Sequence, residues 1–572
     1  ASDVYKRQLV FCLGLGWLTL LSDEFMQLSK HIIGGATFSS NFILLSEDSY
    51  FGGLSEKKPL LHLWSLAIEE QFYIFWPLVI WFFSKTKLNY LFLSLTLGIL
   101  SFWLNISGVQ KDLVHTFYSP QTRVWELLIG ASIASISFTR RQQPLPPILG
   151  SICSFSGTAL LLISLWVIGK ESTFPGAVAL LPTLGTALII WAGPSHWANK
   201  LLSFPVLTGL GKISFSMYLW HWPLLSFARI FEYDPLCKSM RISLVLVSLV
   251  ASWMTYYFIE RPTRFRWSTP VIVRIMPVML FLSGLLGFLI YKNQGYPSRF
   301  PQYQNFVNAD SGTLFPGNLT QTEINQIPHQ SQRSNKNEIT LFVGDSNIVQ
   351  YYPRIDELIR TSPDETNSII FIQRAGCLLI SGANYDGNRH YCNGLMDSAV
   401  NLAISKPEVK NVVIAGLWTK YFIDHIGLSS TVQVGDSEYL RLMANLEKDI
   451  ALLKSHHKKV YLALNIPVGK ELDPKFFLYR NIKNFPHFFE IRSQGINKNQ
   501  ELTSFNHLQR DLTQVALKAQ AEIIDPTTYL CPNDFCPNLT KEGTPIYSDL
   551  QHLSGNYVKT QATFLDFTVR ND

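Results

Sequence analysis

Long apolar runs fill the first half of this 572-residue chain and stop at about residue 292. Residues 72–83 and 275–290, for example, contain no charged side chain. Because a bilayer core requires about 20 apolar residues per helix, these runs predict membrane-spanning helices. Beyond residue 292, short apolar runs alternate with polar sequence. The chain is therefore predicted to join a multi-pass α-helical membrane bundle to a soluble α/β domain.

Nine segments are apolar enough to be predicted as membrane spans. They are residues 8–22, 69–84, 89–107, 123–138, 146–168, 175–193, 206–230, 241–259 and 271–291. The weaker segment 31–46 is expected to be re-entrant or interfacial. Residues 293–337 are rich in Asn, Gln, Ser and Pro without apolar periodicity, which predicts a linker or an irregular packing segment.

Basic residues in alternate loops orient the predicted spans. These loops carry Lys85, Lys87, Arg140, Arg141, Lys200, Arg261, Arg264 and Arg266, whereas Lys111, Lys238 and Arg241 are exceptions. Cytoplasmic loops are enriched in Lys and Arg, so the segment after residue 290 is predicted to lie outside the cytoplasm. The soluble domain is then periplasmic or extracellular.

The overall composition favours a bilayer environment over nucleic acid. Hydrophobic residues make up 47% of the chain and charged residues 16%, and the formal net charge is +6. Dense basic clusters with interleaved aromatic residues do not occur in the sequence. We therefore predict the lipid bilayer as a partner and no nucleic-acid binding.

The soluble half holds four of the seven cysteines, Cys377, Cys392, Cys531 and Cys536. An oxidising compartment favours two disulfides, and four cysteines allow three pairings. Since Cys531 and Cys536 flank a Pro-Asn-Asp turn, a local bridge is predicted there. Zinc ligation is the alternative, although neither pair has CxxC spacing. We predict no bound metal or cofactor.

Polar residues inside the apolar runs are costly in a membrane and therefore suggest a function. Glu69 and Tyr73 are four residues apart and share one helix face. Arg123 and Glu126 open another span three residues apart, and His221 lies in an aromatic run. An Arg fork can grip a phosphate or carboxylate. We predict that these residues form a buried polar site within the membrane. The alternative is an interfacial belt, the interpretation preferred for Glu70, Trp64 and Trp76.

A serine follows the first apolar run of the soluble half. Residues 339–343 predict a buried strand, residues 344–347 (Gly-Asp-Ser-Asn) a turn and residues 348–359 a helix. Ser346 would then lie at a helix N-terminus, where free N–H groups favour an oxyanion. Asp549 and His552 would complete a triad, with His552 as the base and Asp549 fixing its tautomer. The alternative is a surface Asp and His near a helix cap.

Further apolar runs at residues 411–414, 460–464 and 522–525 alternate with helical stretches. This alternation predicts a parallel α/β sandwich, and about 235 residues suffice for its own core. The predicted domains are residues 1–265 (membrane domain), 266–337 (last membrane helix and linker) and 338–572 (soluble domain).

Four membrane motifs resemble the membrane acyltransferase-3 family, in the family's order and spacing. They occupy residues 63–73, 122–130, 213–223 and 258–262. The resemblance implies a cytoplasmic acyl-CoA donor, a bacterial inner (plasma) membrane location and an extracytoplasmic sugar hydroxyl as acceptor. It also implies that the five polar membrane residues named above form an acyl-transfer site. The family's first-helix histidine and its Arg-rich motif are not recognisable here. We therefore expect that the membrane domain is partial and that its first helices are missing.

The soluble half resembles the SGNH hydrolase superfamily, which has a flavodoxin-like parallel sheet. Ser346 matches the first conserved block, Asp549 and His552 match the last, and Gly376 is a candidate for the second. The third block usually supplies an asparagine, but Trp418 stands at about that place. Backbone N–H groups of Ser346 and Gly376, with Asn347 as an extra donor, are therefore the predicted oxyanion hole.

These features together predict a membrane O-acyltransferase. It would move an acyl group, acetyl by resemblance, from acyl-CoA through a Ser346 ester to a surface polysaccharide such as lipopolysaccharide O-antigen. One alternative is a membrane-tethered esterase that removes acyl groups from glycans. Another is a glycan or lipid transporter that carries a binding domain.

Overall fold

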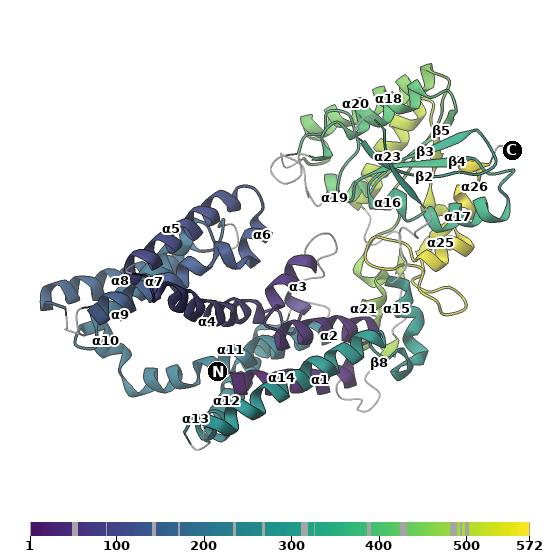
Figure 1. Cartoon of the computed structure of the whole chain (residues 1–572). Coiled ribbons are helices and arrows are strands. Elements are labelled where there is room, and N and C mark those ends of the chain that lie inside the picture. Colours follow the sequence, from purple (N-terminus) through teal and green to yellow (C-terminus); the bar gives the residue numbers. More distant parts are fainter. Residues whose placement is uncertain are drawn as a thin grey trace. The chain divides into compact units, whose positions relative to one another are not determined.

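The computed structural model describes residues 2–47, 55–86, 89–139, 145–169, 172–232, 236–265, 269–310, 319–324, 327–385, 391–423, 432–480, 489–491, 495–497 and 503–570. The chain forms two compact units, Ala1–Phe300 and Pro301–Asp572 (Figure 1). The division falls inside the predicted 266–337 segment. The predicted fold class, a helical membrane bundle followed by an α/β domain, is confirmed.

The first unit is entirely helical in its described residues. Its α-helices are α1 Ser2–Thr19, α2 Ser22–Ala36, α3 Ser40–Glu47, α4 Leu63–Phe83, α5 Tyr90–Val109, α6 Leu113–Tyr118, α7 Val124–Thr139, α8 Pro147–Val167, α9 Leu180–Ala192, α10 Trp197–Leu202, α11 Pro205–Phe231, α12 Lys238–Thr255, α13 Arg261–Phe265 and α14 Thr269–Lys292. Every predicted span coincides with a helix. Among the described residues, four helices are long and apolar enough to cross a membrane: Leu63–Phe83, Tyr90–Val109, Pro147–Val167 and Lys238–Thr263.

Large apolar side chains cover the outside of this unit, and small and polar side chains are buried between its helices beside a core of Leu, Ile and Phe. Trp81, Phe82 and Trp166 are exposed. Between α8 and α9, a Cβ added at Gly157 would lie 2.7 Å from the carbonyl oxygen of Gly185, so only glycine allows this close approach. An apolar exterior with small residues at helix contacts is typical of a membrane bundle.

The structure adds detail at the start of the bundle. The segment 31–46 is divided between two helices, because α2 ends at Ala36 and α3 begins at Ser40, and its re-entrant or interfacial placement stays a prediction. Most of α2 was missed because its Asp23, Glu24 and Lys30 interrupt the apolar run. In addition, α4 begins at Leu63, six residues before the predicted span, so Glu69 lies in its second turn.

A seven-stranded sheet forms the centre of the second unit, in the order β1-β2-β4-β3-β5-β6-β10. The strands are β1 Thr320–Ile324, β2 Ile327–Gln332, β3 Ile339–Gly344, β4 Ser368–Gln373, β5 Val409–Ala415, β6 Lys459–Ala463 and β10 Glu522–Ile524. From β4 to β10 all pairs are parallel, whereas β1 and β2 are antiparallel. Two short antiparallel pairs lie outside it, β7 Leu478–Arg480 with β8 Phe489–Ile491, and β9 Ile496–Asn497 with β11 Phe535–Cys536.

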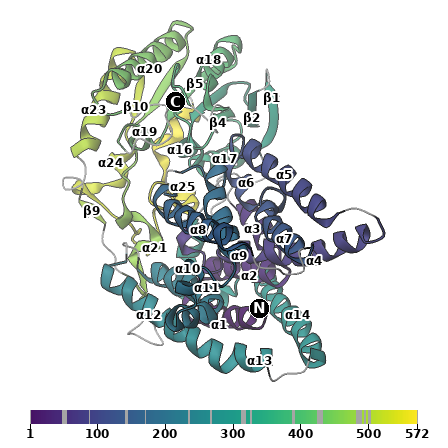
Figure 2. The ribbon, with the colours of Figure 1, turned by 90° about the vertical axis from the view of Figure 1, so that its left-hand side faces the viewer.

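Helices cover both faces of this sheet. The described α-helices of this unit are α15 Gln304–Asp310, α16 Ser346–Val349, α17 Tyr352–Thr361, α18 Leu395–Ser405, α19 Trp418–Phe422, α20 Ser437–Ser455, α21 Pro474–Phe477, α23 Thr503–Lys518, α24 Pro526–Leu530, α25 Gly555–Gln561 and α26 Asp566–Val569, of which α15 and α21 pack on each other away from the sheet. Along β3, Leu341 and Val343 point into one core and Phe342 into the other, as strand alternation requires. Figure 2 shows α20 and α23 side by side along one face, next to β10.

The structure corrects two predictions for this unit. Residues 293–337 are not an irregular linker throughout, because β1 and β2 extend the sheet from within them. The helix predicted over 348–359 is two helices, α16 and α17, interrupted at Gln350 and Tyr351 before Pro353. The strands predicted at 339–343, 411–414, 460–464 and 522–525 are confirmed as β3, β5, β6 and β10.

Candidate active site

Ser346 follows the C-terminal end of β3 and begins the four-residue helix α16. A side chain at Gly344 would place its Cβ 1.9 Å from the carbonyl oxygen of Ala415, so the turn requires glycine. The residues on either side of Ser346 are buried, whereas Ser346 itself is partly exposed. The sharp turn therefore presents one hydroxyl at the edge of the sheet. Since α16 is only one turn long, an oxyanion at Ser346 would be stabilised by the free N–H groups of this turn and not by the dipole of a long helix.

The structure brings Ser346, His552 and Asp549 together although Ser346 and His552 lie 206 residues apart in sequence. The distance between His552 Nε2 and Ser346 Oγ is 2.8 Å, and that between His552 Nδ1 and Asp549 Oδ2 is 2.7 Å. The bond to the carboxylate assigns the proton to Nδ1. Nε2 is then the acceptor for the serine hydroxyl, the arrangement a general base requires.

The Asp549 carboxylate is held in place by its own loop. Its Oδ1 accepts the backbone N–H groups of Gln551 and His552, both at 2.8 Å. Burial acts to raise the pKa of Asp549, but the hydrogen bond and charge of His552, together with these two N–H groups, lower it below the ordinary value. The group is therefore a carboxylate at neutral pH and orients the imidazole.

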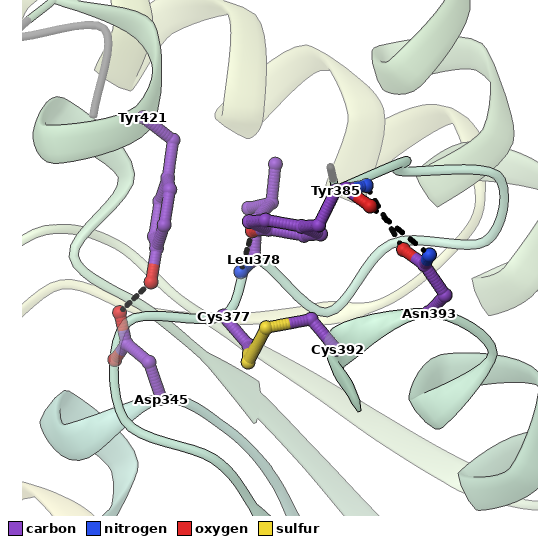
Figure 3. Close-up of a disulfide and its surroundings, with 7 residues drawn as sticks. All are labelled: Asp345, Cys377, Leu378, Tyr385, Cys392, Asn393 and Tyr421. Atoms are coloured by element: carbon purple, nitrogen blue, oxygen red, sulfur yellow. Dashed lines mark hydrogen bonds between the residues drawn. A yellow bond between two sulfur atoms is a disulfide. The ribbon is translucent and has the colours of Figure 1, made fainter. Parts of the chain in front are cut away.

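Asp345 holds the serine turn in place through three hydrogen bonds. Its carboxylate accepts hydrogen bonds from the N–H groups of Asn347 and Leu417, at 2.8 and 3.0 Å, and from the Tyr421 hydroxyl at 2.9 Å (Figure 3). Burial raises the pKa of Asp345, and these hydrogen bonds offset part of that rise. No role was predicted for Asp345 from the sequence, although its position directly before Ser346 in the Gly-Asp-Ser turn could have indicated one.

Gln350 connects the serine helix to the histidine loop. Its amide nitrogen donates to the carbonyl oxygen of Asn347 at 2.9 Å, and its amide oxygen accepts the N–H of Leu553 at 2.8 Å. The side chain is buried. One amide thus sets the spacing between the elements that carry Ser346 and His552. Sequence reasoning missed this residue because only the fold brings residue 553 close to it.

The predicted oxyanion donors lie close to the serine in the chain and in the sheet. Gly376 has a φ of 71° and lies in the loop after β4, which is tied to β3 by the Arg374 N–H bond to the Gly344 carbonyl at 3.3 Å. The Asn347 side chain is buried, and its Nδ2 has no hydrogen-bond partner. Trp418 is not a donor, since its indole N–H binds the carbonyl oxygen of Ala463 at 3.0 Å.

Both cysteine pairs of the soluble half are disulfides, Cys377–Cys392 and Cys531–Cys536. The local bridge predicted across the Pro-Asn-Asp turn is thus present, and the zinc alternative for these thiols is wrong. Figure 3 shows the first disulfide at the start of the loop that follows β4. Cys377 directly follows Gly376, so this bridge fixes the loop that carries a predicted oxyanion donor.

We expect replacement of Cys377 and Cys392 by serine to slow the serine reaction as well as to destabilise the second unit. A bridge that closes a loop of 15 residues contributes about 3 kcal/mol to stability. Release of p-nitrophenol from p-nitrophenyl acetate and thermal unfolding would be measured together. The double replacement of Cys531 and Cys536 is the matched control and should leave the rate unchanged. An unchanged rate in the first variant would contradict the proposed support of Gly376.

In the helical unit, Arg123 and Glu126 form a buried ion pair. Arg123 Nε lies 3.1 Å from Glu126 Oε1, and Arg123 is 9% exposed. Three aromatic rings surround the guanidinium, with the Arg123 Cζ 5.3–5.6 Å from the ring centroids of Trp64, Phe117 and Phe174. The Arg123 Nη1 atom is buried and has no hydrogen-bond partner among the residues that the structure describes. The pair is therefore a built polar site with an unused donor.

His221 lies in a second polar cluster, on the other side of the first turn of α4. Its Nδ1 lies 3.1 Å from the carbonyl oxygen of Met217, and its ring centroid is 6.1 Å from that of His62. The Tyr218 hydroxyl contacts Ser65 Oγ at 2.5 Å, and Gln8 Nε2 lies 2.9 Å from His62 Nε2. Sequence reasoning did not select His62 or Gln8, because only folding brings α1 to the start of α4.

Glu69 and Tyr73 differ in exposure. Glu69 is one turn after Ser65, on the face of α4 that meets α11, and is half-buried. Tyr73 is 59% exposed and packs edge-on against Phe72. Of the five predicted membrane residues, the structure therefore pairs Arg123 with Glu126, places His221 and Glu69 on the side of α11, and leaves Tyr73 on the outer surface.

The fold and the site define a helical membrane protein whose second domain carries a Ser-His-Asp triad at the carboxyl edge of a parallel sheet. Residues 9–259 match the family model described as an acyltransferase domain. Residues 318–562 match the model of the SGNH domain that is fused to AT3 domains. The chain therefore carries an acyltransferase domain followed by an SGNH domain of the kind that is fused to AT3 domains.

Relatives with similar sequences are named as O-acetyltransferases. SAR0937 of Staphylococcus aureus (strain MRSA252), a candidate O-acetyltransferase by its name, is 28% identical over 303 residues, covering 49% of this chain and 50% of its own. The candidate peptidoglycan O-acetyltransferase YrhL of Bacillus subtilis (strain 168) is 27% identical, covering 52% of each chain. O-acetyltransferase OatA of S. aureus (strain MRSA252) is 28% identical, covering 48% of this chain and 50% of its own. The matches span about half the length of these relatives.

Among solved structures, the periplasmic domain of a lipopolysaccharide acetyltransferase from Salmonella ser. Paratyphi A aligns with 47% of this chain and 94% of its own. The sequence identity is 11% and the TM-score is 0.33. Neither value is high enough to support an argument about this chain.

Proposed function

We propose that this protein is an O-acyltransferase that moves an acyl group from acyl-CoA to hydroxyl groups of a surface polysaccharide. The observation that carries the proposal is the hydrogen-bonded Ser346–His552–Asp549 triad in a chain whose other unit is an acyltransferase domain. The names of the relatives support acetyl as the group that is transferred.

The triad supports a two-step reaction. His552 Nε2 takes the proton of Ser346 as Oγ attacks the acyl carbonyl carbon, and the group that carried the acyl leaves with that proton. A sugar hydroxyl then attacks the serine ester, gives its proton to His552, and the proton returns to Ser346 as the C–Oγ bond breaks. Backbone N–H groups of Ser346 and Gly376, with Asn347, are the proposed donors to the oxyanion.

The membrane unit would supply the acyl group. Arg123, with Glu126, is placed to donate from its unused Nη1 to an acyl carbonyl or to a phosphate of the acyl-CoA donor. His221 and Glu69 would form the neighbouring part of the path. Tyr73 has no proposed role in it, given its exposure.

The proposed location is a bacterial inner (plasma) membrane with the second unit periplasmic or extracellular. The basic loops and the two disulfides of the second unit support this orientation. Of the orienting residues, Lys87, Arg140, Arg141 and Arg266 lie outside the described residues. The proposed acceptor is a surface glycan, with O-antigen and peptidoglycan as the two candidates. The name of the B. subtilis relative supports the second.

The test is the amount of ester-linked acetate on surface glycan in cells that express the full-length parent protein. We expect acetate to rise above that of cells with an empty vector. If instead acetate falls on a glycan that was acetylated beforehand, the membrane-tethered esterase is correct. If glycan export changes while acetate does not, the glycan or lipid transporter is correct.

A further inference from the structure

An exposed arginine and an exposed tyrosine lie together beside the serine site. The Arg374 Cζ lies 5.5 Å from the centroid of the Tyr391 ring. Tyr391 is 46% exposed, and Arg374 is also exposed. Neither residue belongs to the triad or to the proposed oxyanion hole. The pair therefore offers an aromatic ring and a guanidinium to a group that approaches from solvent.

Arg374 lies at the same edge of the sheet as Ser346. Arg374 is the first residue after β4, and its N–H binds the carbonyl oxygen of Gly344, two residues before Ser346. Arg374 is also only two residues before Gly376 in the chain. Arg374 is therefore adjacent both to the strand that leads to the nucleophile and to the loop of the predicted oxyanion donor.

The disulfide fixes Tyr391 to the same place. Tyr391 directly precedes Cys392, whose Cα lies 5.5 Å from that of Cys377, and Cys377 is three residues after Arg374. One covalent bridge therefore holds both members of the pair next to the loop that follows β4. A surface ring held this firmly loses little conformational entropy when it binds a partner.

The chemistry of the pair suits a sugar. The apolar C–H face of a pyranose ring packs on an exposed aromatic ring, and a guanidinium donates several hydrogen bonds to hydroxyl groups. We propose that Arg374 and Tyr391 form the acceptor subsite, which holds a pyranose ring of the glycan while its hydroxyl attacks the Ser346 ester. This inference rests on the proposed function of the serine site and adds where the acceptor binds.

The experiment separates acceptor binding from the first chemical step. The full chain in detergent would be given p-nitrophenyl acetate, with solubilised peptidoglycan fragments or O-antigen polysaccharide as acceptor. We expect Tyr391→Ala to raise the KM for the glycan about tenfold at an unchanged kcat, since one aromatic contact is lost. Release of p-nitrophenol without glycan should stay within about twofold of wild type. Tyr391→Phe should keep the wild-type KM, because the ring remains.

Tyr529→Ala is the matched control. Tyr529 is 58% exposed and packs against Phe564, so it is an exposed tyrosine of the same unit. It should change neither the KM nor the release of p-nitrophenol. A wild-type KM in Tyr391→Ala would overturn the subsite and leave the proposed function intact. Wild-type protein that hydrolyses the ester and transfers acetate to neither glycan would overturn both.

Discussion

Ser346→Ala is expected to abolish acetylation of the glycan and to lower p-nitrophenol release by about 10⁶-fold. Losing the nucleophile of a Ser-His-Asp triad costs about this much, because the remaining groups act as a unit. The hydrogen bond from Ser346 to His552 is the geometric reason to expect the full effect here. Ester-linked acetate on glycan and p-nitrophenol release would be measured in parallel.

Ser455→Ala is a suitable control for this prediction. Ser455 lies at the exposed end of α20, where its hydroxyl bonds the carbonyl oxygen of Leu452, and its loss should leave both activities unchanged. Glycan acetylation that persists in Ser346→Ala would place the transfer step in the membrane unit alone. The triad would then need another substrate.

Arg123→Leu is expected to reduce transfer from acyl-CoA by at least about 100-fold and to leave p-nitrophenol release at the wild-type rate. The substitution removes the buried donor and leaves the Glu126 carboxylate without its partner. A lone buried charge costs about 3–5 kcal/mol, so a part of the effect would come from a disturbed bundle. Transfer from acetyl-CoA and thermal stability in detergent are the measurements.

A double variant, Arg123→Leu with Glu126→Leu, separates function from folding. Replacing both partners of a buried pair by apolar residues is often close to neutral in stability. If the pair is functional, the double variant is stable and still inactive with acetyl-CoA. If the double variant recovers transfer, the pair is structural. Arg229→Leu, which breaks a more exposed pair with Glu56, should keep full activity.

The triad could be predicted because its signals are local in the sequence. A strand followed by Gly-Asp-Ser predicts a turn that presents Ser346, and the three-residue spacing of Asp549 and His552 permits the 2.7 Å contact that the structure has. Gln350 could not be predicted in this way, since its partner Leu553 reaches it only through the fold. The same reason hid His62 and Gln8 in the membrane unit.

The incorrect predictions come from sequence patterns that are compatible with more than one structure. Strands β1 and β2 carry sequences such as Thr-Gln-Thr-Glu and His-Gln-Ser-Gln, which lack the apolar alternation of a buried strand. They join the sheet through backbone hydrogen bonds at its edge. Tyr73 shares a helix face with Glu69 by spacing, but every residue of α4 after Tyr73 is apolar, so spacing alone does not show which face is buried.

The order of the triad residues along the chain also determines when, during synthesis and folding, the triad becomes complete. The nucleophile directly follows β3, the central strand of the seven-stranded sheet, whereas the base is His552, near the end of the chain. The carbonyl oxygen of Thr568 binds Thr340 Oγ1 at 2.9 Å and Asn411 Nδ2 at 2.8 Å, so the last helix also secures β3 and β5. A chain still being synthesised therefore has a serine but no base. Ester chemistry begins only after the final segment has closed on the sheet.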